Sequence, residues 1–119
     1  MTVGRIVEVL EARIHTGADM VDIEVEAACG ADLMSDVMAF VKDRVVLLTG
    51  LVNAQALRTA DLLDIKVVVF VRGKLPPEDL VRQAEEAGIV LLSTRLSLFL
   101  SCGRLYEAGL RLGGTREIG

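Results

Sequence analysis

The chain has 119 residues, of which 52% are hydrophobic and 3% aromatic, and it carries a net charge of −4. This length suffices for one core, which aliphatic side chains must fill. The acidic balance argues against a nucleic-acid partner, since phosphate neutralisation needs a concentrated basic face. No apolar stretch approaches the ~18 residues that span a bilayer, and no secretory segment opens the chain. We therefore expect a cytoplasmic protein that does not bind membranes.

The first thirty residues predict one helix and two strands. Apolar residues at helical spacing predict a helix over Thr2–Glu11. Arg13–Thr16 is a short strand candidate. Asp22–Cys29 alternates between acidic and apolar residues, which predicts a strand covered on one side near a sheet edge, and Gly30 ends it.

A second helix is predicted after this strand. Leu33, Val37, Phe40 and Val41 recur at helical spacing, so we expect these side chains to point inward and the helix to close near Asp43.

Three unbroken apolar runs dominate the rest of the chain: Val45–Leu48, Val67–Val71 and Ile89–Leu92. Strands that are apolar on both faces occur in parallel sheets covered by helices on both sides. Because each run precedes a turn and an amphipathic helix, we predict an α/β fold with a mostly parallel sheet. It contains three consecutive strand–helix units, an N-terminal helix and edge strands. Residues 1–112 form a single domain in this interpretation, and residues 113–119 form a mobile tail.

The helices after the three runs have predicted inward faces. Pro76 and Pro77 suit the first turn of the second of these helices, and Gly88 suits its end. The expected inward residues are Ala56, Leu57, Ala60 and Leu63, then Leu80, Ala84 and Ala87, then Leu98, Cys102, Leu105 and Gly109.

Few residues suggest catalysis or metal binding. One histidine and two distant cysteines offer no metal-ligand spacing, so we predict neither a metal nor a cofactor. His15 is interpreted as a surface residue rather than a general base. Cys29 and Cys102 are interpreted as independent, reduced thiols. Tyr106 has the spacing of a core or interface residue. No nucleophile–base or paired-carboxylate set can be assembled.

A binding site is predicted where the parallel strands end. Ligands of such sheets bind outside the carboxyl ends, where helix N-termini and turn residues meet. The residues expected there are Thr49, Gly50, Asn53, Arg72, Gly73, Lys74, Ser93 and Thr94. Two cations among hydroxyls and glycines favour a small anionic ligand, with Arg72 and Lys74 holding its charge. The simpler alternative is that these residues only cap helices and turn the chain.

A second set of polar residues surrounds the predicted second helix. Asp32, Ser35 and Asp36 lie around its start, where carboxylates usually cap a helix, and a second site or interface is the alternative. Arg58 and Thr59 are expected on the outer side of the next helix, in solvent or against another subunit. The turns contain neither a Walker loop nor a dinucleotide fingerprint.

Taken together, these segments resemble the DRTGG domain. The resemblance extends over Thr2–Leu110 and rests on Gly30–Val37, Leu47–Leu51, Arg58–Ala60, Val69–Lys74 and Cys102–Leu110. The chain departs from the family pattern where Leu51 follows Gly50, since the family has two glycines there. No CBS domain accompanies the resemblance in this sequence.

The resemblance implies a regulatory module rather than a reaction. Such domains occur alone, beside CBS domains in regulated pyrophosphatases and in some phosphotransacetylases, and they are distantly similar to the N-terminal domain of HPr kinase/phosphorylase. It implies a homodimer that senses an adenine nucleotide or another small anion, without catalytic residues. The alternatives are a protein–protein interaction module that binds no small ligand and a small enzyme related to phosphoryl transfer.

Overall fold

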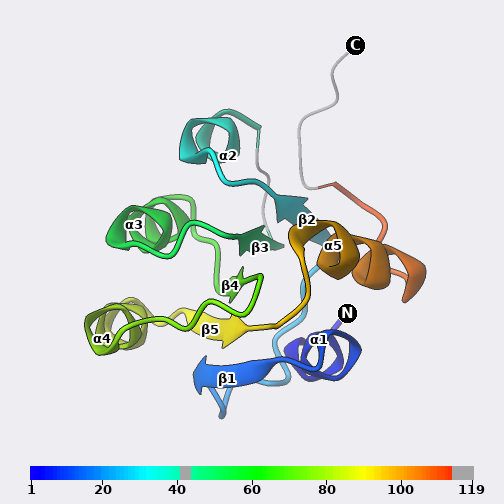
Figure 1. The fold of residues 1–119 in the computed structure, drawn as a ribbon, viewed down its shortest axis with the longest axis horizontal. Helices are drawn as coiled ribbons and strands as arrows, with labels where there is room; N and C mark the ends of the chain where they lie inside the picture. Colours follow the sequence, from blue (N-terminus) through cyan, green and yellow to red (C-terminus); the bar gives the residue numbers. More distant parts are fainter. Residues whose placement is uncertain (41–43, 114–119) are drawn as a thin grey trace.

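The computed structural model describes residues 1–40 and 44–113 as five helices around a five-stranded sheet (Figure 1). The helices are α1 (Val3–Leu10), α2 (Met34–Phe40), α3 (Ala54–Leu62), α4 (Glu78–Ala87) and α5 (Leu98–Glu107). The strands are β1 (Arg13–Thr16), β2 (Ala27–Gly30), β3 (Val45–Thr49), β4 (Val67–Phe70) and β5 (Val90–Ser93).

The sheet has the order β1-β5-β4-β3-β2 and is mostly parallel, as the sequence predicts. Strands β2 to β5 pair in parallel, and only β1 runs antiparallel, beside β5. The three apolar runs are the three central strands, and every residue of these strands is buried. β1 therefore begins at the edge of the sheet where β4 and β5 end.

Helices cover both faces of the sheet and create two cores (Figure 1). On one face α2, α3 and α4 pack against alternate strand residues such as Leu47 and Leu91. On the other face α1 and α5 pack against the intervening residues, including Leu48 and Leu92. Successive strand residues point to opposite faces, so unbroken apolar runs are required where both faces are covered.

The strand expected over Asp22–Cys29 is shorter than predicted. Of this segment only β2 (Ala27–Gly30) pairs with β3, because Ile23 and Val25 bond to the N-terminal segment instead. Val3 donates its backbone N–H to Ile23 at 2.9 Å, and Val25 donates to Met1 at 2.8 Å. The alternation of this segment therefore reflects packing beside α1 rather than sheet pairing. The edge position of β2 and its end at Gly30 agree with the prediction.

The second helix differs from its expected inward face. Leu33 precedes α2 and is 61% exposed, while Met34 and Val37 are buried. Because α2 begins at Met34, Leu33 lies in the loop before the helix and not on its buried face. The predicted positions of the Phe40 side chain, Val41 and Asp43 lie outside the described residues.

Smaller differences occur at helix ends. Pro77 is the N-cap of α4, so both prolines precede the helix rather than occupying its first turn. Leu63 caps α3 and is half-buried, and Gly109 follows α5 and is exposed.

Thr59 was expected on the outer side of α3 but is buried at 5% exposure, because the helix packs on a wider face than its apolar spacing indicates. Gly88 ends α4 in the left-handed conformation, as predicted.

Candidate functional site

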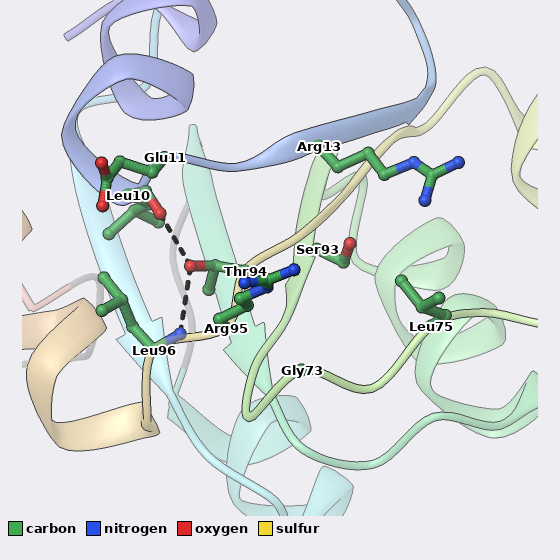
Figure 2. Close-up of a pocket in the computed structure, with 9 residues that line it drawn as sticks. All are labelled: Leu10, Glu11, Arg13, Gly73, Leu75, Ser93, Thr94, Arg95 and Leu96. Carbon is green, nitrogen blue, oxygen red and sulfur yellow. Dashed lines mark hydrogen bonds between the residues drawn. The ribbon is translucent and has the colours of Figure 1, made fainter.

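A pocket of about 570 Å³ lies at the edge where the parallel strands end (Figure 2). The end of α1, the start of β1, the β4–α4 loop and the β5–α5 loop meet there. Its volume falls within the range of small-molecule sites. We call it the edge pocket, and it is lined by Leu10, Glu11, Arg13, Gly73, Leu75, Ser93, Thr94, Arg95 and Leu96.

The polar side of the edge pocket carries two guanidinium groups. Arg13 comes from β1 and Arg95 from the β5–α5 loop, and both side chains are exposed. Figure 2 shows them on either side of Ser93 in that view. Among the described residues neither guanidinium forms an ion pair, whereas Glu11 lies 3.8 Å from Arg104. The pocket therefore has cationic groups available for an anion.

Three leucines complete the lining. Leu10 is fully buried at the end of α1, Leu96 is half-buried, and Leu75 is 59% exposed. A ligand in the edge pocket would therefore meet apolar side chains as well as cationic ones.

Thr94 has a structural role in the lining. Its hydroxyl donates to the backbone oxygen of Leu10 at 2.7 Å and accepts from the N–H of Leu96 at 3.3 Å (Figure 2). These two bonds occupy the hydroxyl and tie the end of α1 to the β5–α5 loop. Thr94 therefore shapes the pocket, and its hydroxyl is not a free donor for a ligand.

Ser93 is paired with His15, which the sequence interpretation had placed at the surface. The Nε2 atom of His15 lies 2.7 Å from the Ser93 hydroxyl, and the imidazole is half-buried. Burial, with a smaller contribution from the Arg13 charge, lowers the pKa of His15 from its ordinary value. The sequence signal was the spacing of His15 from Arg13 in one strand candidate, but only the pairing of β1 with β5 reveals the contact.

Other predicted residues gather at a neighbouring turn, outside the lining of the edge pocket. They are Asp32, Thr49, Gly50, Arg72 and Lys74. Asp32 accepts from the backbone N–H of Gly50 at 2.7 Å and from the hydroxyl of Thr49 at 3.2 Å. Lys74 donates to the Gly50 carbonyl at 2.8 Å. Asp32 thus links the β2–α2 and β3–α3 loops. Lys74 binds the same turn and is not among the residues that line the edge pocket.

Arg72 lies over this turn. A Cβ on Gly50 would be only 2.8 Å from the Arg72 guanidinium, so the glycine permits the close approach. Arg72 itself has a φ of 65°, which is unfavourable for a bulky residue. Its N–H donates to Leu96 at 2.8 Å, and that of Gly73 donates to Thr94 at 2.9 Å. These bonds pin the β4–α4 loop to the β5–α5 loop.

The remaining predicted residues cap a helix or lie on the exposed surface of one. Asn53 caps α3 by accepting from the N–H of Ala56 at 3.1 Å, in agreement with the simpler alternative. Ser35, Asp36 and Arg58 are exposed on α2 and α3.

The thiols show no features of a reactive site. Cys29 and Cys102 are free and belong to the cores on opposite faces of the sheet. Burial raises the pKa of both, which disfavours the nucleophilic thiolate. Within residues 1–40 and 44–113 no group of three potential metal ligands occurs. No helix in this part of the chain is long and apolar enough to cross a bilayer.

A second cavity, of about 380 Å³, lies at the opposite edge of the sheet. Its two cationic side chains already form surface ion pairs, with Arg44 3.1 Å from Glu26 and Lys66 3.0 Å from Asp64. This cavity therefore offers an anion less available charge than the edge pocket.

The fold is similar to that of a solved regulatory structure. One match is the crystal structure of the CBS and DRTGG domains of the regulatory region of Clostridium perfringens pyrophosphatase complexed with its activator, diadenosine tetraphosphate. The TM-score is 0.75 at 13% sequence identity, over 87% of this chain and 45% of that chain. This chain thus spans less than half of its structural neighbour. The likeness supports a DRTGG-like fold. No protein-family model matches the sequence, and no curated protein sequence matches it.

Proposed function

We propose that this chain is a non-enzymatic, ligand-sensing regulatory domain that binds a small anionic ligand in the edge pocket. The observation that carries the proposal is the placement of Arg13 and Arg95 around Ser93 in a cavity of ligand size. Guanidinium groups bind phosphate through charge-assisted hydrogen bonds, which are the strong ones. Of the residues predicted from sequence, Gly73, Ser93 and Thr94 belong to this site.

Adenine nucleotides are the leading candidates for the ligand. Their phosphates suit the two guanidinium groups, and their bases suit the accessible leucines at positions 75 and 96. The structural neighbour belongs to a regulatory region that was crystallised with diadenosine tetraphosphate. That likeness supports a regulatory role and a nucleotide ligand for this chain.

A thermal-shift screen with AMP, ADP, ATP, pyrophosphate and sulfate tests the proposal. A ligand that binds only the folded state must raise the melting temperature. Arg13→Ala and Arg95→Ala should each weaken binding roughly 10- to 100-fold, the scale of one charged hydrogen bond. Arg58→Ala is the matched control, because Arg58 is an exposed arginine outside the pocket. No stabilisation by any of these anions at millimolar concentration would refute the proposal.

A small phosphoryl-transfer enzyme is the less favoured reading. The structural neighbour belongs to a regulatory region, and no metal-ligand group occurs among the described residues. We expect no phosphate release from ATP or pyrophosphate, with Mg²⁺ supplied in the assay. Release that Arg13→Ala abolishes would assign catalysis to the edge pocket instead.

A homodimer through α5 forms the second part of the proposal, and it rests on a separate observation. Phe99 is 82% exposed, Leu100 47% and Tyr106 57%. Phe99, Gly103 and Tyr106 are spaced to share one face of α5. Large exposed apolar groups of this kind mark interfaces, and a second copy of the chain is the proposed partner.

Sedimentation velocity over a range of concentrations tests the dimer. Phe99→Glu should shift the protein to monomer, while Leu62→Glu, at a 71% exposed leucine on α3, should not. A wild-type protein that remains monomeric would refute the homodimer and favour an interface for a different protein. Capture of a partner that Phe99→Glu abolishes would then support the interaction-module alternative.

A further inference from the structure

His15 occupies an irregularity of the edge strand. The pairing of β1 with β5 matches Arg13 with Ser93, Ile14 with Leu92 and Thr16 with Leu91, so the register skips His15. Such a β-bulge redirects a side chain and is common beside functional sites. Here the imidazole reaches the hydroxyl of Ser93, which lines the edge pocket.

Buried hydrogen bonds hold the bulge in place. The Thr16 hydroxyl donates to the backbone oxygen of Ile89 at 2.6 Å and accepts from the N–H of Leu91 at 3.0 Å. A side chain thus replaces the strand-to-strand bonds that the bulge removes. The position of His15 is therefore part of the folded framework.

We propose that His15 is a positioning residue that makes Ser93 a hydrogen-bond donor to an anion in the edge pocket. If Nε2 carries a proton and donates to the Ser93 oxygen, the hydroxyl proton of Ser93 is free to point at the ligand. In the opposite arrangement the serine donates to the imidazole and presents lone pairs to the pocket, which would repel an anion. An anion therefore selects the first arrangement. This inference rests on the proposed function and specifies how the site recognises charge.

The charge of a bound anion also couples ligand binding to proton uptake by His15. The Arg13 charge opposes protonation of His15, and an anion beside Arg13 would offset that repulsion. Among the groups that affect protonation of His15, β5 supplies only the Ser93 hydroxyl, because this strand has no charged residue. The charged residues of α4, which packs against β1, are all exposed: Glu78, Asp79, Arg82, Glu85 and Glu86. Anion affinity should therefore rise as pH falls, by at most about ten-fold per pH unit for one proton.

NMR titration of the wild-type protein provides a direct test. His15 is the single histidine of the chain, so its imidazole signals need no assignment. The probe is sulfate, which stays a dianion over the pH range in which histidine titrates. Saturating sulfate should raise the pKa of His15, and the ¹⁵N shifts should report a protonated Nε2. If sulfate leaves the protein unperturbed, AMP and pyrophosphate at fixed pH replace it for the ¹⁵N readout.

Three variants separate positioning from a structural role. Ser93→Ala should weaken sulfate binding roughly ten-fold, as should His15→Leu. His15→Gln keeps an N–H donor, so it should restore most of the affinity while abolishing the pH dependence. A bond that merely holds β1 would leave the His15 tautomer unchanged by sulfate, and His15→Gln would bind sulfate no better than His15→Leu.

The outcomes for this inference and for the proposed function differ. Binding that leaves the His15 pKa and tautomer unchanged overturns the role of His15 but leaves the edge pocket as the site. Absence of any response to sulfate, AMP or pyrophosphate overturns both.

Discussion

Thr94→Val should destabilise the protein and loosen the edge pocket. The substitution keeps the shape of a side chain that is 3% exposed but removes its hydroxyl. The carbonyl of Leu10 and the N–H of Leu96 each lose a partner, at 2.7 Å and 3.3 Å. Unpaired buried groups cost about 1–3 kcal/mol, and the added methyl returns about 0.8 kcal/mol at most. With two such groups, we expect a net loss of about 1–5 kcal/mol.

Urea denaturation measures this loss as a lower midpoint at an unchanged slope. Thr94→Ser is the matched control, because it keeps both hydrogen bonds and loses one methyl group, at about 1 kcal/mol. The Val variant should also bind sulfate more weakly than the Ser variant, since Arg95 and Leu96 follow position 94 in the loop. A Val variant at least as stable as the Ser variant would refute the assigned role of the hydroxyl.

Three further predictions concern packing, protonation and the strained turn. Gly30→Ala should cost about 1–3 kcal/mol, because its Cβ would lie 2.6 Å from the Cys102 sulfur, and Cys102→Ala in the same chain should relieve most of this cost in urea denaturation. The free energy of unfolding should fall as pH drops below about 6.5, because His15 takes up a proton in the unfolded chain before it does so in the folded protein. This fall should level off below the lowered pKa of His15 in the folded state. His15→Gln should flatten that pH profile. Arg72→Gly should change stability by less than about 1 kcal/mol, since relief of the left-handed strain offsets the entropy of glycine, and calorimetry should show a smaller loss of sulfate affinity than for Arg13→Ala.

The layered architecture can be predicted from the sequence because apolar runs and turns are patterns of neighbouring residues. An unbroken run such as Val67–Val71 has no polar face to expose, so both sides of its strand must be covered. Parallel neighbours then send their turns to one edge, which is why Gly73, Ser93 and Thr94 were predicted near one another. These three residues line the edge pocket.

The same reasoning failed where a contact depended on a distant segment. Residues 22–26 alternate like a strand, yet Ile23 and Val25 bond to the N-terminal segment, and no local pattern predicts this partner. Leu33 shows the limit of helix periodicity, since it has helical spacing with Val37 but precedes α2 and is exposed.

The sequence alone determined that this chain forms an α/β sheet and at which edge to search for a ligand, because strand burial and turn chemistry are written in neighbouring residues. Only the tertiary structure decided which charges face the pocket. Arg72 and Lys74 lie at the Gly50 turn, outside the lining of the edge pocket, whereas Arg13 lines the pocket. The pairing of β1 with β5 places Arg13 opposite Ser93, eighty residues later in the chain. Antiparallel pairing of β1 with β5 is a long-range event, so local periodicity does not encode the site that it creates.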